Sequence, residues 1–571
     1  AIGRLALYAQ DPASAVEMYN TAVGYLAGTA VTTGTYNTLI GGLAGDAITT
    51  GVRNTTMGYA SGGQLTTGSY NVALGMATLG ATTTQSNNTA VGYEALNQNT
   101  AANNTAVGYF ALNVNTTGAN NVALGANALQ PNTTGAWNTA LGKGALASNT
   151  TASNNTAVGF ESLVSNTTGT RNNAIGATAL DANTTGNYNV ALGYASLSTN
   201  TTGDSNVALG DAALNANTTG ASNIAVGGST LQLNTTGASN VAVGTTALYA
   251  NTTASNNTAV GHSALLANTT GASNVAVGYL ALDANTTASY GTAIGHQALS
   301  ANTTGTQNTA VGAAALQAAT TAAANTATGY GCLGATTTGA SNTAMGSLAL
   351  NANTTAANNT AVGYASLVAN TTGTQNTAMG SGAGDSITTG NNNDCFGYLA
   401  GNAITTGAQN VAIGVTALGT TTTGTYNVGI GYAASASSAT VSNEFTLGST
   451  NINNLRCNDQ SIAALSDERD KTDIVNSSYG LDFINTVRPV QFKWETRDGN
   501  IKDGKTRLGF IAQELLTACN GNNDVLDLVM DENPNKIEAK YSNLLPVLTK
   551  AIQELSAQVE ALTARITTLE G

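Results

Sequence analysis

A 17-residue period governs most of this chain. Asn-Thr-Ala-Val-Gly, or a close variant, ends at Gly24 and then at every seventeenth residue to Gly92. After one 16-residue step the motif ends at Gly108 and continues with the same period to Gly431, which makes 25 units, and a degenerate copy follows at Gly448. A period this short and regular predicts one structural turn per repeat, each stacked on the next.

The sequence predicts three parts. Residues 1–431 are a repeat rod, 432–465 are a degenerate repeat and a connector, and 466–571 are a separate domain with its own composition. The chain begins Ala-Ile-Gly, which resembles the end of a repeat, so we expect an N-terminal part that precedes this sequence.

Charge is scarce in the repeats. Residues 1–448 carry four basic side chains against twelve acidic ones, and the whole chain has a net charge of −13. Such a surface cannot neutralise phosphates, so we expect no nucleic-acid partner. No stretch approaches the roughly 20 apolar residues of a membrane span, so we expect no membrane insertion.

Cysteine and histidine give no pattern of a metal or redox site. The two histidines, His262 and His296, each follow a repeat Gly and have no acidic or Cys neighbours. We therefore expect no metal and no cofactor, and we interpret the four widely spaced cysteines as isolated apolar residues rather than disulfides. They are Cys332, Cys395, Cys457 and Cys519.

The common unit is Asn-Thr-Ala-Val-Gly-x-x-Ala-Leu-x-x-Asn-Thr-Thr-Gly-x-x. Its first part predicts a short strand, in which the second and fourth residues share one face and the nearly invariant Ala points the other way. We expect this Ala to make a tight contact with another chain or another layer. Ala-Leu predicts a second short strand, and Asn-Thr-Thr-Gly predicts the closing turn.

Five units exchange two positions together. Where Leu, four residues after the repeat Gly, becomes Gly, the Asn seven residues after it becomes apolar, as in Gly45 with Ile48. A fixed core volume filled by two routes gives this pattern, so both positions should approach the interior, and the usual Asn should form an inward hydrogen-bonded ladder. The same Asn begins Asn-Thr-Thr, a glycosylation sequon in fourteen units, and an inward Asn would not be available for glycosylation.

These observations predict a mostly β fold, a parallel β-roll or β-solenoid about 120 Å long at the usual strand spacing. Each coil has too few apolar side chains for its own core, so stability should come from stacking and from association of chains. The strand motif resembles the head repeats of trimeric autotransporter adhesins, and that resemblance implies a trimeric roll.

Residues after Leu465 carry different motifs: Ser466-Asp-Glu-Arg-Asp-Lys471, strand-like segments at 488–494 and 507–515, and a C-terminal helix. The helix has an apolar heptad over 545–570 that predicts a coiled coil. Its apolar positions are Leu545, Leu548, Ile552, Leu555, Val559, Leu562, Ile566 and Leu569.

This region resembles the C-terminal intramolecular chaperone of endosialidase-type phage tailspikes and tail fibres. The likeness lies in Ser-Asp-x-Arg-x-Lys, Gly-Phe-Ile-Ala-Gln-Glu and the terminal Ala-Ile-Gln-Glu-Leu. It implies a small α+β domain over 466–571 that trimerises, drives fibre assembly and often cuts the chain just before its motif Ser. By this resemblance Ser466 is the nucleophile and Lys471 its base, and Arg469 is a candidate for lowering the pKa of that Lys. The alternative is a Ser that caps a helix.

The resemblance implies a homotrimeric bacteriophage tail fibre or spike on the virion, outside the cell. Its partners would be a host cell-surface glycan or protein receptor, and other virion tail proteins bound through the missing N-terminal part. Exposed Tyr residues after several repeat Gly, such as Tyr93 and Tyr109, are candidates for sugar stacking. The alternatives are a cellular surface adhesin, an ice-binding surface, which adjacent Thr residues disfavour, and a glycosidase, which would need paired carboxylates that the repeats lack.

Overall fold

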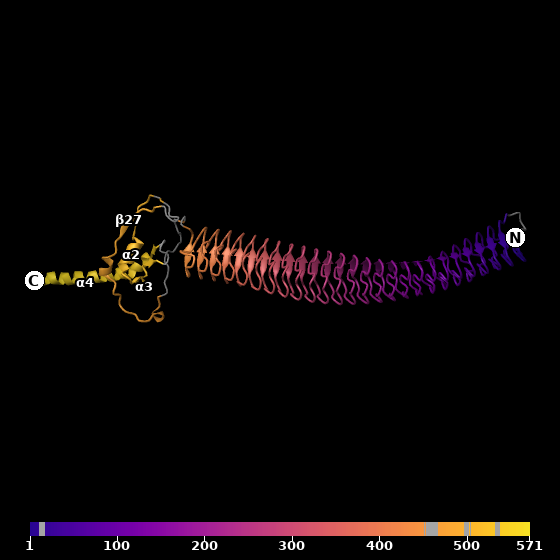
Figure 1. Ribbon diagram of the computed structural model, residues 1–571, viewed down its shortest axis with the longest axis horizontal. Coiled ribbons are helices and arrows are strands. Elements are labelled where there is room, and N and C mark those ends of the chain that lie inside the picture. The colour runs from indigo at the N-terminus through magenta and orange to yellow at the C-terminus, as the bar shows by residue number, and fades with distance from the viewer. Residues whose placement is uncertain (11–16, 450–451, 453–465, 496–501, 503, 532–536) are drawn as a thin grey trace. The chain divides into compact units, whose positions relative to one another are not determined.

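The computed structural model describes residues 1–10, 17–449, 452, 466–495, 502, 504–531 and 537–571 (Figure 1). Most of the expected connector and Cys457 lie outside the described residues. The chain divides into two compact units, residues 1–355 and 356–571, and each is described by itself.

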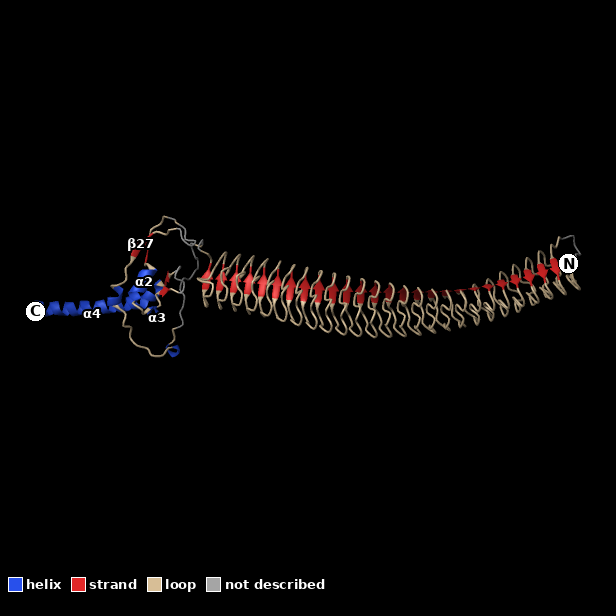
Figure 2. Ribbon diagram, in the orientation of Figure 1, coloured by secondary structure: helices blue, strands red, loops and turns tan. Residues whose placement is uncertain are grey.

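The first unit contains one three-residue strand per repeat (Figure 2). Its strands are β1 Thr21–Val23, β2 Thr38–Ile40, β3 Thr55–Met57, β4 Val72–Leu74, β5 Thr89–Val91, β6 Thr105–Val107, β7 Val122–Leu124, β8 Thr139–Leu141, β9 Thr156–Val158, β10 Asn173–Ile175, β11 Val190–Leu192, β12 Val207–Leu209, β13 Ile224–Val226, β14 Val241–Val243, β15 Thr258–Val260, β16 Val275–Val277, β17 Thr292–Ile294, β18 Thr309–Val311, β19 Thr326–Thr328 and β20 Thr343–Met345.

The second unit continues with similar coils and ends in a small α+β region. Its strands are β21 Thr360–Val362, β22 Thr377–Met379, β23 Asp394–Phe396, β24 Val411–Ile413, β25 Val428–Ile430, β26 Phe445–Leu447, β27 Val490–Phe492, β28 Arg507–Gly509, β29 Val529–Met530 and β30 Glu538–Ala539. Its helices are η1 Glu468–Asp470, α1 Leu481–Ile484, α2 Ala512–Cys519, α3 Asn523–Leu526, η2 Tyr541–Asn543 and α4 Leu544–Glu570.

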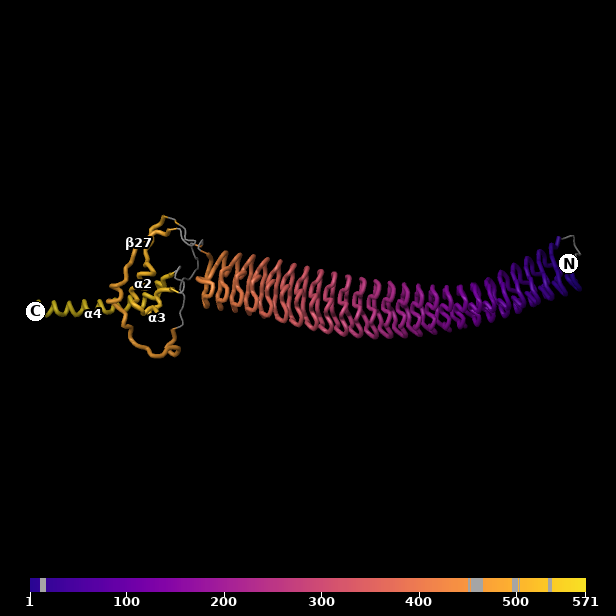
Figure 3. Tube along the Cα trace, viewed as in Figure 1, coloured from indigo at the N-terminus to yellow at the C-terminus, as the bar shows by residue number. Residues whose placement is uncertain are grey.

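The coils form the expected parallel β-solenoid of 17-residue repeats. Each strand pairs with its neighbour in parallel and in register, as where Val207 and Ala208 of β12 pair with Ile224 and Ala225 of β13. Hydrogen bonds between coils continue outside the strands, for example from Leu214 N–H to the Thr230 carbonyl at 3.0 Å. Figure 3 shows the chain rising by one coil per repeat. Backbone bonding between successive coils therefore continues along the whole turn and holds neighbouring coils together.

The Ala in the middle of each strand faces the interior of its own coil. Ala208 and Ala225 are fully buried within the single chain, whereas the residues on either side of them point outward. Of the two contacts expected for this Ala, the one with another chain is therefore wrong, and the one with another layer is confirmed. The Ala has a partner inside its own coil: at Gly429, which stands at this strand position, an added Cβ would lie 2.9 Å from the Leu418 side chain.

The second predicted strand, Ala-Leu, is also wrong, because this segment is a turn. Leu214 has φ 52° and Ala212 has φ 53°, both in the left-handed region, which no strand residue adopts. The turn still places the Leu214 side chain in the core, where it is fully buried. Narrow coils need sharp turns on all sides, and the left-handed residues supply them.

The structure confirms that the positions four and seven residues after the repeat Gly share one space in the core. Ile48 is fully buried, and a Cβ added to Gly45 would lie 2.7 Å from the Ile48 Cδ1 atom. The Ile therefore occupies the space that Leu fills in the common coil.

The inward Asn ladder is confirmed. Asn217 Nδ2 donates to Asn200 Oδ1 at 2.8 Å and to the Gly220 carbonyl at 2.9 Å, and Asn217 Oδ1 accepts from Asn234 Nδ2 at 2.8 Å. All three Asn residues are fully buried, so the folded coil offers these sequons no route to a glycosyl transferase.

A second ladder runs through the Asn that precedes each strand. Asn223 N–H donates to Asn206 Oδ1 at 3.0 Å, and Asn223 Nδ2 donates to the Gly237 carbonyl at 2.9 Å. This buried Asn links three successive coils through the side chain and backbone, which explains why the repeat begins with Asn.

Four Asp residues occupy one position of the repeat, five residues after its Gly. At this position Asn97 and Asn215 donate Nδ2 to a main-chain carbonyl of the preceding coil at 2.8 and 3.0 Å. Within the described residues, one carboxylate oxygen of each of Asp46, Asp181 and Asp283 is buried without a hydrogen-bond partner. Burial raises the pKa of all three carboxyls. An ionised carboxylate cannot donate as the Asn amide does, so these sites favour a proton.

We expect Asp46→Asn, Asp181→Asn and Asp283→Asn together to raise the thermal unfolding midpoint at pH 7. A raised folded-state pKa gives stability that is complete below the unfolded pKa near 3.8 and is lost as pH rises through the folded pKa. The gain should be about 1 kcal/mol per site at pH 7 and should vanish near pH 3. Circular dichroism melts at both pH values measure it. Asp211→Asn, in an exposed position, is the control, and an equal gain there contradicts the explanation.

The C-terminal region has its own core, formed mainly by Leu515, Leu528, Val529 and Leu544. β27 and β28 pair antiparallel. The strand expected over 507–515 is only partly correct, because β28 ends at Gly509 and α2 begins at Ala512. Among the described residues no helix is long and apolar enough for a membrane span, and no group of three or more potential ligand side chains gathers for a metal ion.

Candidate functional site

Ser466 and Lys471, the predicted nucleophile and base, lie in contact at the start of the C-terminal region. Lys471 Nζ donates to Ser466 Oγ at 2.6 Å, and both side chains are exposed. The η1 turn brings them together, because it reverses the chain between the two residues. A hydroxyl within hydrogen-bond reach of an amine has the geometry of a nucleophile and its general base.

Asp467, not Ser466, caps the η1 turn. Its carboxylate accepts the Arg469 backbone N–H at 2.9 Å. The same carboxylate accepts from Arg469 Nε and Nη2, at 3.0 and 2.6 Å, and these bonds lower the pKa of Asp467. The side-chain contacts that the structure gives Arg469 therefore go to Asp467 rather than to Lys471, and the proposed effect of Arg469 on the Lys is balanced by a neighbouring negative charge.

Helix α4 presents the predicted heptad as an exposed apolar seam. Leu545, Ile552 and Val559 are each more than half exposed, and Leu569 is 85% exposed. The opposite side of the first turns is buried in the region's own core through Leu544 and Val547. The helix thus packs one face on its own domain, while the heptad face stays exposed among the described residues. Figure 1 shows α4 extending beyond α2 and α3 to the C-terminus.

Glu554, in the terminal Ala-Ile-Gln-Glu-Leu motif, has a role that the sequence did not show. Its Oε2 accepts the Leu481 backbone N–H at 2.7 Å, which ties the start of α1 to α4 across 73 residues of sequence. This bond lowers the pKa of Glu554. A Cβ on Gly480 would lie 2.3 Å from the same carboxylate, so Gly480 permits the contact. The motif residue joins two helices, and no periodicity could have indicated its partner.

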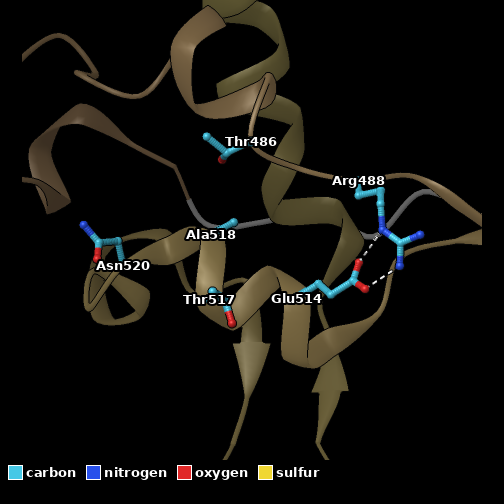
Figure 4. Close-up of a pocket in the computed structure, with 6 residues that line it drawn as sticks. All are labelled: Thr486, Arg488, Glu514, Thr517, Ala518 and Asn520. Atoms are coloured by element: carbon cyan, nitrogen blue, oxygen red, sulfur yellow. Dashed lines mark hydrogen bonds and ion pairs between the residues drawn. The ribbon is translucent and has the colours of Figure 1, made fainter.

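A hollow of about 500 Å³ lies beside α2 (Figure 4). Arg488 and Glu514 form a two-bonded ion pair on its wall, with Arg488 Nε 2.9 Å from Glu514 Oε2, and the pair lowers the pKa of Glu514. Thr486, Thr517, Ala518 and Asn520 complete the lining, and neither Ser466 nor Lys471 belongs to it. Its cation and carboxylate already satisfy each other.

Some of the exposed Tyr residues after the repeat Gly stack on a ring of the next coil. Tyr93 and Tyr109 are nearly parallel with ring centroids 5.6 Å apart, and Tyr279 lies between His262 and His296 at 5.7 and 5.4 Å. Both faces of the Tyr279 ring are therefore covered, whereas Tyr194 and Tyr364 are 64% and 61% exposed and remain candidates for sugar stacking.

A second aromatic column, five residues before the repeat Gly, was not foreseen from the sequence. Arg53 lies between Tyr36 and Tyr70, 5.6 and 5.5 Å from their ring centroids, and Arg53 Nη1 donates to the Tyr70 hydroxyl at 2.9 Å. The 17-residue spacing of the three residues is the signal that could have found this column.

Comparison with known proteins gives one match. No curated protein and no solved structure matches the chain. The family model described as the chaperone of endosialidase matches residues 466–522, which contain the Ser466–Lys471 pair, the Arg488–Glu514 pair and helix α2. The C-terminal region that follows the solenoid is therefore similar to the chaperone of endosialidase.

Proposed function

We propose that this chain is a homotrimeric bacteriophage tail fibre or spike, part of the virion, whose solenoid reaches a host-cell surface. The observation that carries the proposal is the match to the chaperone of endosialidase at residues 466–522, C-terminal to the repeats. A glycan or protein receptor and other tail proteins are its partners in this proposal.

The C-terminal region acts as a folding clamp for the solenoid. Because successive coils are nearly identical, three chains aligned one coil out of step keep almost all their contacts, so repeats alone do not define a register. The exposed seam of α4, with Ile552 and Val559 among its residues, forms a coiled coil of three chains that aligns them before the coils associate.

Deleting residues 466–571 before expression should abolish correctly aligned trimers. We expect aggregates and oligomers of mixed mass by native mass spectrometry and light scattering. The matched control removes one whole coil, residues 211–227, and keeps the C-terminal region. It should give trimers as readily as the intact chain, because the deletion removes one complete 17-residue repeat and leaves the remaining coils in the same repeat register. Uniform trimers from the 466–571 deletion would contradict the clamp.

The Ser466–Lys471 pair cuts the peptide bond that precedes Ser466. Neutral Lys471 Nζ accepts the Ser466 hydroxyl proton while Oγ attacks the preceding carbonyl carbon. The Ser466 amide nitrogen leaves and takes that proton back, which gives an ester. Water then hydrolyses the ester to a carboxylate and restores the hydroxyl. The 2.6 Å contact between Nζ and Oγ supports this assignment.

Ser466→Ala and Lys471→Met should each reduce cleavage by at least about 100-fold, since each removes one member of the pair. Mass spectrometry of the unsubstituted protein should find a fragment that begins at Ser466. Mass spectrometry of each variant should find the uncut chain. Thr472→Ala, in an exposed neighbour, is the control and should be cut normally. An uncut parent chain, or equal cleavage in the Ser466→Ala variant, contradicts the assignment.

A further inference from the structure

The outward side of the strands in residues 1–355 carries two unbroken columns of uncharged side chains. The third residue of every strand from β1 to β20 is Val, Leu, Ile or Met, with the single exception of Thr328. The first residue is Thr, Val or Ile, except for Asn173. Both columns point away from the buried Ala, and Leu192 and Ile175 in the third-residue column are 46% and 42% exposed. We call these two columns the strand face.

The few charged residues of these coils lie at repeat positions outside the strand face. The column directly after the repeat Gly contains Lys143, Asp211 and His262, and the column five residues before it contains Arg53 and Arg171. The strand face has no Asp, Glu, Lys or Arg in twenty coils. The centre of a protein interface is depleted of charge, and the strand face is consistent with that composition.

The exposed apolar area is that of an interface. Leu124, Leu141 and Leu192 of this face are each 40% or more exposed, and the two columns run through twenty coils. A standard specific complex buries about 800 Å² per partner. The largest apolar patch on a typical monomer is about 300–600 Å². Water contact along the whole strand face would therefore be costly.

We propose that the strand face is where copies of this chain pack on one another, parallel and in register. An occupant of the full length needs apolar side chains at the spacing of the coils, one rung about every 4.8 Å. The strand face of another copy has this spacing, and, because neither copy carries charge there, nothing repels. The inference rests on the proposed trimer and identifies the side of the coil that forms the interface between its chains. The Asn-Thr-Thr turns then lie on the outside.

Cross-linking of full-chain variants that each gain one Cys tests this assignment. Leu192→Cys places a thiol on the strand face in β11, and Thr202→Cys places one on the exposed turn of the same coil. Both are made in a Cys457→Ser background, in which the remaining Cys332, Cys395 and Cys519 are buried, and a short bis-maleimide is added to each variant and to that parent. We expect linked pairs of chains, two of every three, from Leu192→Cys, and only the parent's background from Thr202→Cys.

Native mass spectrometry of the same samples separates this inference from the proposed function. A trimer that cross-links at Thr202→Cys but not at Leu192→Cys overturns the strand-face assignment and leaves the trimer standing. A monomer of either variant and of the parent overturns both. A trimer in which neither Cys links also overturns the assignment, because three strand faces that meet would bring the three Leu192→Cys thiols together.

Discussion

Gly227→Ala is expected to destabilise the solenoid by about 3 kcal/mol or more, whereas Gly228→Ala should leave its stability within about 0.5 kcal/mol. Gly227 directly follows β13 and has φ 131°, a conformation that L side chains rarely adopt. An added Cβ would lie 2.8 Å from the Gly244 carbonyl carbon in the next coil. The neighbour Gly228 has no atom within 4 Å of an added Cβ.

The same arrangement recurs along the stack, so the result reports on the whole solenoid. At Gly193, with φ 137°, a Cβ would lie 2.5 Å from the Gly210 carbonyl oxygen. Each coil thus sits so close to the next at this corner that only hydrogen fits. Guanidinium unfolding followed by circular dichroism measures the difference between the two variants. Equal stability of Gly227→Ala and Gly228→Ala would show that the coils do not approach as described.

Asn217→Leu should cost about 2–6 kcal/mol, because it leaves the buried Asn200 Oδ1 without a hydrogen-bond donor and overpacks the core. The Gly220 carbonyl loses one donor and keeps Asn206 Nδ2, and Asn234 Nδ2 loses one acceptor and keeps the Gly237 carbonyl. The new side chain also competes with Leu214 for core volume. Thr219→Leu, exposed on the same turn, is the matched control and should change stability by less than about 0.5 kcal/mol.

A double variant separates the two costs of Asn217→Leu. Leu214→Gly with Asn217→Leu reproduces the combination seen at Gly62 and Leu65. It should be more stable than the sum of the two single changes predicts, because the Leu then has room. Because the Asn ladder remains broken, the double variant should still be less stable than the parent protein. Strict additivity in guanidinium unfolding would show that the two positions do not share a core volume.

The residues that could be placed from the sequence are those whose role repeats. The exchange of Leu for Gly with Asn for Ile at Gly45 and Ile48 showed that both positions are internal, and the structure confirms it. Ser466 and Lys471 were found through a motif, and the structure places them in contact. Such features can be recognised in the sequence, because aligned repeats show which positions change together and because a motif keeps a constant spacing between its residues.

Other features needed atoms that lie far apart in sequence. Glu554 meets Leu481 across 73 residues, and the order of residues gives no sign of that pair. The β28 strand and the α2 helix share one apolar run, so where the strand ended was decided by the surrounding core. The partnerless carboxylate oxygen of Asp46 appears only when the preceding coil is in place.

The sequence by itself determined the period, the parallel stacking, the strand that precedes each repeat Gly and the change of character after Leu465, because translational repetition and local motifs are properties of the chain alone. The tertiary structure decided which face of the strand is internal. Alternation along a strand separates two faces but does not say which one the coil closes around. When the narrow coil closes, the small Ala of the strand lies inside, together with the turn residue Leu214 and its equivalents in the left-handed conformation. The larger Val and Leu side chains at the ends of the strand stay outside.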